Sequence, residues 1–294
     1  MPEEGLAGAF NLTEEARAKI NLALHVTGQR PDGYHLLDML VTFADHGDRL
    51  GFMRSPADKF TLSGRFGGTL AGDGGTNLVL KARDLLRETV GALAFPVHIH
   101  LEKNLPIASG IGGGSADAAA TLRGLIRLWG ATLPRETLAT LALRLGADVP
   151  MCLESRPLIA RGIGEEIEPV PELPAFAMVL ANPLKGVSTP EVFRRLTIKN
   201  NPALSLPETA GWLAAIDAAR NDLEPPARQI VPEIAVISTM LQARGALLTR
   251  MSGSGATYFG IFATIAAARH AAAALHDERP DWYFQATETV SGDA

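Results

Sequence analysis

The distribution of hydrophobic and polar residues along this chain predicts an alternation of strands and helices. Residues 97–101 read Val-His-Ile-His-Leu, a period-two pattern that is typical of a half-buried strand. A glycine-rich segment follows at 106–114. The apolar spacing of residues 115–128 then predicts a helix, and Ser115 suits the N-cap of that helix. The pattern therefore places a glycine-rich loop between a strand and a helix.

A second helix is predicted at 134–145, because Pro134 suits a first helical turn and Gly146 suits a C-terminal stop. The remaining predicted elements are strands at 177–181, 246–251, 258–262 and 282–290, and helices at 230–244 and 266–275. Helices are mixed with stretches that look like antiparallel strands. We therefore expect a fold of the α+β class.

A domain boundary is expected between residues 158 and 173. Gly162, Gly164 and three prolines interrupt this region, with acidic residues between them. Composition alone leaves open whether the region is a linker or a surface loop. We predict an N-terminal domain at 1–165 that carries the glycine-rich loop, and a C-terminal domain at 166–294.

Composition and charge exclude several classes of protein. The chain has 294 residues, of which 47% are hydrophobic and 20% charged, and this balance is typical of a globular protein. Its net charge is −5 and no basic stretch dominates, so we expect no nucleic-acid partner. No run of about 20 apolar residues is free of charges, so we expect no membrane span.

The cysteine count bears on the cellular compartment. Cys152 is the single cysteine and lies in an apolar run, which predicts a buried hydrophobic residue rather than a nucleophile. One thiol forms no internal disulfide. Residues 1–10 are acidic without a long apolar core, so we expect no secretory leader segment there. We therefore expect a soluble, cytoplasmic protein.

The strongest feature for function is the glycine-rich loop, whose residues 106–119 read Pro-Ile-Ala-Ser-Gly-Ile-Gly-Gly-Gly-Ser-Ala-Asp-Ala-Ala. Glycines let backbone N–H groups converge where side chains would block the approach of a ligand. The following helix adds free N–H groups and the positive end of its dipole. This combination predicts a phosphate-binding site.

Three common phosphate loops do not fit this segment. A Walker loop requires Lys after its last glycine, but Gly114 is followed by Ser115 and Ala116. A dinucleotide fingerprint that starts at Gly110 would require glycine at position 115. The protein-kinase signatures His-Arg-Asp and Asp-Phe-Gly are absent from the sequence.

The loop instead resembles the second motif of the GHMP kinases, the family of galactokinase, homoserine kinase, mevalonate kinase and phosphomevalonate kinase. In that family this loop wraps the phosphates of ATP. The resemblance implies ATP contacts at the following residues: Pro106, Ile107, Ala108, Ser109, Gly110, Ile111, Gly112, Gly113, Gly114, Ser115 and Ala116.

Two further segments agree with this family. Near the N-terminus, Lys19 and Asn21 are two positions apart and would share one face of a strand. Taken alone, the pair indicates little, because Lys and Asn are common on the solvent-facing side of a strand. Residues 30–35 read Arg-Pro-Asp-Gly-Tyr-His, a turn with an aromatic pair at its exit.

The second segment lies near the C-terminus. Residues 250–257 read Arg-Met-Ser-Gly-Ser-Gly-Ala-Thr. Taken alone, this segment is a tight turn, and it resembles the third GHMP motif.

The three segments occur in the family's order, and the resemblance spans residues 14–290. The N-terminal segments and the run Leu-Gly-Ala-Asp-Val-Pro at 145–150 are similar to the subgroup that phosphorylates the 2-hydroxyl of 4-diphosphocytidyl-2-C-methyl-D-erythritol, in the methylerythritol phosphate route to isoprenoids. The resemblance implies a two-domain GHMP kinase fold. Its N-terminal domain would resemble domain 2 of ribosomal protein S5, and its C-terminal domain would be an α/β sandwich.

The resemblance also implies roles for individual residues. Asp148 would accept the proton of the substrate hydroxyl and Lys19 would lie beside it, although by position alone Asp148 is a capping or turn residue. The acceptor would contact Asn21, Tyr34, His35, Thr189 and Phe193, with its cytosine near the aromatic rings. Asp32 is expected to be a turn residue rather than a base.

On the ATP side, Asn77 and Lys103 match positions near the adenine. ATP chemistry implies Mg²⁺ carried mainly by phosphates and water, without a tightly bound cofactor or a set of metal ligands in the protein. Two alternatives stay open: Ser115 contacts either a phosphate or the metal, and Asp117 either binds Mg²⁺ or faces solvent. His98 and His100 share a strand face but lack a third ligand, so we expect no zinc site.

The sequence departs from its relatives at a few positions. Val41 stands where some relatives carry a second aromatic residue, so the cytosine pocket is expected to be less aromatic. Two other hypotheses remain: another GHMP small-molecule kinase with a different acceptor, or a nucleotide-binding protein without catalysis. ATP and the acceptor are the expected partners, and the chain is expected to be a monomer or a homodimer.

Overall fold

The computed structural model describes residues 10–70, 77–207 and 210–293, so the first nine residues, where we expected no leader segment, lie outside it. The chain forms two compact units. The first contains residues up to Ala18, Gly47–Ile107 and Gly112–Glu154. The second contains Lys19–His46, Ala108–Ile111 and the residues from Ser155 onward. Because both units are discontinuous in sequence, the boundary at residue 165 stays a prediction.

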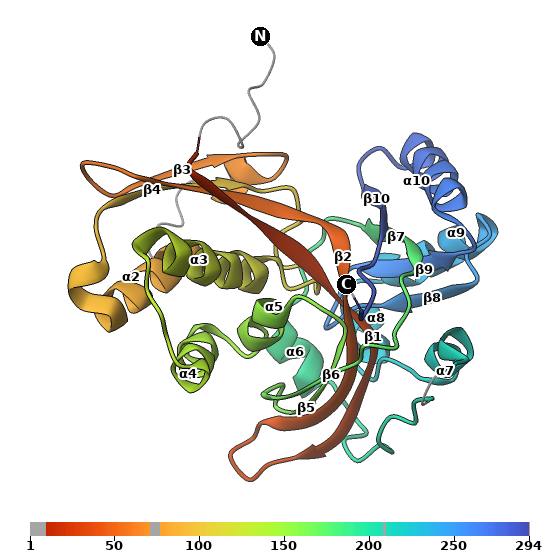
Figure 1. Cartoon of the computed structure of the whole chain (residues 1–294). Helices are drawn as coiled ribbons and strands as arrows, with labels where there is room; N and C mark the ends of the chain where they lie inside the picture. Colours follow the sequence, from red (N-terminus) through yellow and green to blue (C-terminus); the bar gives the residue numbers. More distant parts are fainter. Residues whose placement is uncertain (1–9, 71–76, 208–209, 294) are drawn as a thin grey trace. The chain divides into compact units, whose positions relative to one another are not determined.

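Two long strands, β1 (Leu12–Gln29) and β2 (His35–Arg54), run through both units and are drawn in red and orange in Figure 1. A tight turn joins them. In this turn Gly33 has φ 93°, and its N–H donates to the carbonyl of Arg30 at 2.9 Å. Glycine adopts this left-handed conformation without the strain that a Cβ atom would cause.

In the first unit, the C-terminal part of β2 pairs antiparallel with β4 (Val97–Glu102), which pairs in parallel with β3 (Lys59–Ser63). The strand predicted at 97–101 is thus confirmed. The helices and 3₁₀ turns of this unit are α2 (Leu78–Val90), α3 (Gly113–Trp129), α4 (Arg135–Leu145), α5 (Val149–Glu154), η1 (Gly67–Leu70) and η2 (Gly91–Leu93).

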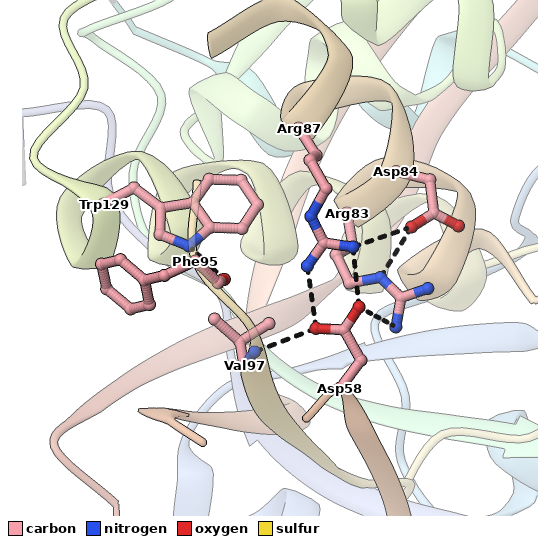
Figure 2. Close-up of polar contacts among 7 residues, drawn as sticks. All are labelled: Asp58, Arg83, Asp84, Arg87, Phe95, Val97 and Trp129. Carbon is pink, nitrogen blue, oxygen red and sulfur yellow. Dashed lines mark hydrogen bonds and ion pairs between the residues drawn. The ribbon is translucent and has the colours of Figure 1, made fainter. Parts of the chain in front are cut away.

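Helix α3 is the centre of the first unit and packs against α2, α4 and α5. Gly124 of α3 lies so close to the ring of Phe52 on β2 that a Cβ atom would clash with it. At the far end of α3, the Trp129 ring N–H donates to the carbonyl of Phe95 at 3.1 Å, and the Arg87 guanidinium of α2 lies 5.7 Å from the Trp129 ring (Figure 2). These contacts fix α3, which follows the glycine-rich loop.

The second unit contains a four-stranded antiparallel sheet in the order β10-β7-β9-β8. Helix α10 packs on β10 and β7, and α9 packs on β8 and β9. The N-terminal part of β2 pairs with β5, which pairs with β6. The elements are β5 (Leu158–Gly162), β6 (Glu166–Pro169), β7 (Ala177–Asn182), α6 (Thr189–Arg194), α7 (Trp212–Ala218), α8 (Glu224–Ile230), α9 (Glu233–Ala243), β8 (Leu248–Met251), β9 (Tyr258–Phe262), α10 (Ile265–Glu278) and β10 (Tyr283–Glu288).

The mixture of helices and largely antiparallel sheets confirms the α+β class. Two element predictions are corrected. The helix predicted at 115–128 begins at Gly113, so Ser115 lies within its first turn and Gly112 is the N-cap. The helix predicted at 230–244 is confirmed as α9, but it begins at Glu233, because Ile230 is the last residue of α8 and Val231 and Pro232 lie between the two helices. Proline disfavours helical geometry at the residue before it, so one helix ends there and another begins.

Among the described residues, no helix combines the length and apolar character needed to cross a membrane.

Candidate active site

The middle of the glycine-rich loop is held by two other segments of the second unit. The N–H of Lys19 on β1 donates to the carbonyl of Ile111 at 2.9 Å. The N–H of Thr257, just before β9, donates to the carbonyl of Ser109 at 3.0 Å. Backbone bonds therefore join all three of the segments that sequence analysis singled out.

Ser252 strengthens this junction. Its hydroxyl accepts the N–H of Asn21 at 3.0 Å and donates to the carbonyl of Gly110 at 3.1 Å. Gly110 has φ 78°, and a Cβ atom there would lie 2.5 Å from the Ser252 carbonyl oxygen and 2.7 Å from that of Gly255. Only glycine permits this approach of two backbones.

Lys19 and Asn21 lie on one face of β1, as predicted. The Lys19 ammonium donates to the Asn21 side-chain oxygen at 3.0 Å, and the two side chains are 3% and 0% exposed. The interpretation as an ordinary solvent-facing pair is therefore wrong. The Asn21 amide also contacts the Met39 sulfur at 3.3 Å, so both ends of this side chain are held.

Two of the predicted acceptor residues form an aromatic stack. The rings of His35 on β2 and Phe193 on α6 are 4.7 Å apart and inclined by 24°. Burial, and then the positive charge of Lys199, lower the pKa of His35, which favours a neutral ring. The His35 Nε2 atom is buried and has no hydrogen-bond partner among the described residues.

The other predicted acceptor residues also belong to the second unit. Tyr34 is 61% exposed at the exit of the hairpin turn. Asp32 accepts the N–H of Tyr34 at 3.2 Å and pairs with Arg30, which confirms its role in the turn. The hydroxyl of Thr189, at the start of α6, lies 2.7 Å from the hydroxyl of Ser254. The third motif is thereby connected to α6.

In the first unit, the glycine-rich loop ends at the N-terminus of α3. Gly112 is the N-cap, with a left-handed φ of 64°. The first intrahelical bond runs from the N–H of Ala116 to the carbonyl of Gly112 at 2.8 Å. The preceding N–H groups, those of Gly113, Gly114 and Ser115, have no partner within the helix. Together with the helix dipole they form a site suited to an anion.

Lys103 and Asp117 lie inside the protein, beneath this helix terminus. Both are 3% exposed, and the Lys103 ammonium donates to the Asp117 carboxylate at 2.7 Å and to that of Asp48. The alternative in which Asp117 faces solvent is therefore wrong. The backbone N–H and carbonyl of Lys103 are also bonded, to Ser63 and Phe66. The predicted contact of Lys103 with ATP stays a prediction, and all its polar groups serve internal bonds.

Asn77 and Asp148 both stand directly before helices of the first unit. The Asn77 side-chain oxygen caps α2 by accepting the N–H of Val79 at 2.9 Å. Asp148 is half-buried in the turn before α5, and its carbonyl accepts the N–H of Cys152 at 3.1 Å. Both residues are thus held in defined non-helical positions. Cys152 is 3% exposed, as predicted for a buried hydrophobic residue.

The described residues contain no group of three or more His, Cys, Asp or Glu side chains that could hold a metal ion. His98 and His100 each bond to the hydroxyl of Thr61 at 2.8 Å, so this hydroxyl occupies the space between them. The two histidine rings therefore belong to a row of hydrogen-bonded polar side chains on the surface of the sheet.

Sequence analysis missed Ser252 and Asp48 as individual residues. Ser252 was visible only as one small residue of the third motif. Asp48 lies inside β2 with 0% exposure, and its place in a strand carries no local signal of its partners. Their contacts join positions that are distant in sequence, so only the folded chain reveals them.

Comparison with known proteins identifies the same family that the sequence motifs resemble. A model of the GHMP kinases N terminal domain matches residues 77–156, and a model of the GHMP kinases C terminal domain matches residues 203–281. The chain is 84% identical to 4-diphosphocytidyl-2-C-methyl-D-erythritol kinase of Rhizobium etli over 292 residues, 99% of each protein. It is 53% identical to the kinase of the same name from Brucella abortus, over 93% of each protein.

Solved structures give the same result. A crystal structure of 4-(cytidine 5'-diphospho)-2C-methyl-D-erythritol kinase is 35% identical, with a TM-score of 0.79, and the match covers 95% of this chain and 99% of that one. Homoserine kinase from Cytophaga hutchinsonii matches with a TM-score of 0.66 at 18% identity, over 94% of this chain and 93% of that one. The second match concerns the fold alone.

Proposed function

This chain belongs to the 4-diphosphocytidyl-2-C-methyl-D-erythritol kinases of the GHMP kinase family, and from that premise we propose that it transfers the γ-phosphoryl group of ATP to the 2-hydroxyl of 4-diphosphocytidyl-2-C-methyl-D-erythritol. The resemblance found in the three motifs and the two-domain GHMP fold are both confirmed. ATP is the phosphate donor of the family.

The observation that carries these assignments is the junction around Lys19. The backbone of Lys19 is bonded to Ile111 of the glycine-rich loop, and its ammonium is held by Asn21. A buried cation is therefore fixed on the strand that holds the middle of the loop. Phosphoryl transfer depends chiefly on such positioning and on charge compensation.

We assign Asp148 as the base and Lys19 as its charge partner. The 2-hydroxyl oxygen forms a bond to the γ-phosphorus while the bond from that phosphorus to the β–γ bridging oxygen breaks. The hydroxyl proton passes to the Asp148 carboxylate, and ADP leaves. A general base of this kind contributes about 10²–10⁴-fold to the rate.

We assign the ATP phosphates to the residues 106–116. Backbone N–H groups within 107–115, together with the N-terminus of α3, compensate the negative charge, and the Ser115 hydroxyl contacts a phosphate. Asn77 lies near the adenine in this assignment. Its side-chain oxygen caps α2, so a contact with the base falls to its side-chain NH₂ group.

We assign the acceptor's cytosine to the surroundings of the stack of His35 and Phe193. The exposed ring of Tyr34 offers a second stacking surface. Thr189 and Asn21 bind other parts of the acceptor. Val41 is fully buried in β2, so it provides packing in place of an aromatic contact.

Mg²⁺ accompanies ATP in this proposal. The described residues offer no multidentate cage for it. We therefore expect the ion to arrive on the phosphates, with water completing its coordination. We further propose a domain boundary near residue 165, between the two family matches, and a cytoplasmic monomer or homodimer that binds neither nucleic acid nor membrane.

The test of the function is a turnover assay. Purified protein with ATP should release ADP only when 4-diphosphocytidyl-2-C-methyl-D-erythritol is added, and mevalonate or homoserine should not replace it. A different preferred acceptor would overturn the substrate assignment. ATP binding without any acceptor-dependent release of ADP would overturn the assignment as an enzyme.

The test of the base is Asp148→Ala. It should lower kcat by about 100-fold or more while the unfolding temperature stays close to that of the wild type. Asp277→Ala, an exposed aspartate on α10, is the matched control and should keep full activity. Normal turnover by the Asp148 variant would remove this residue from the mechanism.

A further inference from the structure

Three ionisable side chains of the first unit meet beneath the N-terminus of α3. Lys103 is 3% exposed, Asp48 is 0% exposed and Asp117 is 3% exposed. The Lys103 ammonium donates to the Asp117 carboxylate at 2.7 Å and to the Asp48 carboxylate. The three residues come from β2, from the segment after β4 and from α3, so this buried cluster joins three elements.

The cluster holds both ends of the glycine-rich loop. At the entry, the second carboxylate oxygen of Asp48 accepts the N–H groups of Asn104 at 2.5 Å and Leu105 at 2.8 Å. At the exit, Asp117 is part of the start of α3. Lys103 connects the two carboxylates. The separation of the loop's two ends is therefore set by these ionic contacts.

The cluster also lies directly against the proposed phosphate site. A Cβ atom on Gly113, the first residue of α3, would lie 3.1 Å from the Lys103 ammonium and 3.7 Å from the Asp48 carboxylate. The N–H groups of that first turn are the ones that we assign to the phosphates. A charge on the cluster therefore acts on a bound triphosphate across one turn of helix.

The charges of the cluster do not cancel when every group is ionised. One ammonium and two carboxylates leave one excess negative charge, and the Asp117 Oδ1 atom is buried without a hydrogen-bond partner among the described residues. A buried negative charge in excess of its counter-charges is costly, and a carboxylate in that position tends to take up a proton instead. A proton on Asp117 would make the cluster neutral.

The pKa values agree with this charge count. Burial, opposed by Lys103 and reinforced by Asp48, raises the pKa of Asp117 to about 8. Burial alone would lower the pKa of Lys103, but the two carboxylates outweigh it and raise the value. On the neighbouring α2, Arg83 and Arg87 are directed to Asp58 instead (Figure 2). Asp48 and Lys103 are thus the charged groups that act on Asp117.

We propose that Asp48, Lys103 and Asp117 are positioning residues of the nucleotide site, which fix the two ends of the glycine-rich loop and keep the protein beneath the first turn of α3 electrically neutral when a nucleoside triphosphate binds. The inference rests on the proposed function in one respect, the assignment of ATP phosphates to this loop. It gives Lys103 an internal role in nucleotide binding, acting through the loop.

The first test compares Asp117→Asn with the wild type. Between about pH 7 and pH 9.5 the KM for ATP of the wild type should rise by about threefold or more, because deprotonation places a negative charge beneath the phosphates. The amide of the variant has nearly the same shape as the carboxylate but does not ionise. The KM for ATP of the variant should therefore not increase over this pH range. Asp58→Asn, a matched change in a surface ion pair, should keep the wild-type profile.

The second test separates positioning from mere stability. Asp48→Asn weakens the contacts with Lys103 and with the loop entry, so it should raise the KM for ATP by about tenfold and leave the KM for the acceptor within about twofold. A variant that only melts at a lower temperature, or in which both KM values rise equally, would show that the cluster is merely structural. A KM profile for Asp117→Asn parallel to that of the wild type would also overturn the proposal.

A measurement without turnover keeps this inference apart from the proposed function. Asp117 has a raised pKa in the folded protein, so its ionisation costs stability as the pH rises from the unfolded value of about 4 to about 8. The unfolding temperature of Asp117→Asn, relative to that of the wild type, should therefore increase as the pH rises across this range. Calorimetric binding of ATP at pH 7 and pH 9.5 completes the test. A pH-dependent affinity in a protein that lacks turnover would sustain the inference and overturn the function alone, and a pH-independent affinity would overturn the inference.

Discussion

The hydroxyl group of Ser252 donates a hydrogen bond to the carbonyl oxygen of Gly110, which lies 142 residues earlier in the chain. The same hydroxyl accepts the backbone N–H of Asn21. One small side chain therefore joins the third motif, the glycine-rich loop and the strand of the proposed charge partner, Lys19. Several consequences of this junction are measurable.

Gly110→Ala should abolish most of the kinase activity and destabilise the protein. The new Cβ atom would lie 2.5 Å from the Ser252 carbonyl oxygen, and φ is 78° at this position. Overpacking and left-handed strain together should cost about 2–5 kcal/mol in the free energy of unfolding, measured by urea denaturation. Gly186→Ala is the control, because nothing lies within 4 Å of its Cβ position. Equal stability of the two variants would contradict the close approach.

Ser252→Ala should lower both stability and kcat. It leaves the Asn21 N–H without its acceptor and releases the Gly110 carbonyl in a buried site. An unsatisfied buried group costs about 1–3 kcal/mol, which chemical denaturation would detect. Ser238→Ala removes a hydroxyl contact with Thr249 instead, so it should keep kcat. If kcat also survives in Ser252→Ala, this junction does not position the reacting groups.

Tyr34→Ala should raise the KM for the acceptor more than the KM for ATP. Stacking of a base on an aromatic ring is worth about 1–3 kcal/mol, which corresponds to roughly 5- to 150-fold in affinity. Tyr34 is 61% exposed, so the fold should survive the change. Ile198→Ala, at an apolar side chain that is 64% exposed, should leave both KM values unchanged. A selective rise in the KM for ATP would reject the assignment of the cytosine site.

Phe193→Ala should have the same direction of effect, with an added consequence for His35. The two rings are stacked at 4.7 Å, so removing Phe193 exposes the imidazole to water. Burial is the main reason for the lowered pKa of His35, and this pKa should therefore rise in the variant. NMR titration of the imidazole would measure the change. An unaltered titration would show that the stack does not shield this ring.

Asp58→Asn should remove an acid-sensitive part of the stability. Figure 2 shows Arg83 and Arg87 directed to the Asp58 carboxylate, which also accepts the N–H of Val97. The hydrogen bonds from Arg87 are the main cause that lowers the pKa of Asp58, although burial opposes it. This contribution is present above the unfolded pKa of about 4 and is lost as the pH falls through the folded value.

Because the pair is partly exposed, we expect the variant to lose only about 1 kcal/mol at pH 7. The difference from the wild type should shrink below about pH 4, where the wild type also loses the charge. Urea denaturation at pH 7 and at about pH 3 would measure it. A difference that stays constant with pH would show that the charge of Asp58 contributes nothing.

Local patterns predicted the elements that carry the site. The alternation at 97–101 predicted β4, and the glycines at 110–114 predicted a loop before a helix. Sequence placed the N-cap of that helix at Ser115, whereas Gly112 holds it in a left-handed conformation. Capping preferences describe side-chain caps, and this helix begins without one. The boundary therefore depended on backbone geometry that residue preferences do not encode.

The burial of charged residues was beyond local reasoning. Lys19 and Asn21 were expected on one strand face, but a period-two spacing does not say whether that face meets solvent or the interior. Asp117 was left between solvent and metal, and the structure places it against Lys103. Partners such as Asp48, 55 residues before Lys103, become neighbours only when β2 and β4 pair.

The sequence by itself determined the family and the α+β class, and it supplied the hypotheses that the loop binds phosphate and that Lys19 and Asp148 do the chemistry. These properties follow from residue types at short spacings, which a linear chain displays directly. The tertiary structure alone decided that Ser252 meets Gly110, that His35 stacks on Phe193 and that Lys103 lies between two aspartates. Such contacts join distant positions, and the exclusion of water from the folded interior determines how strongly their charges interact.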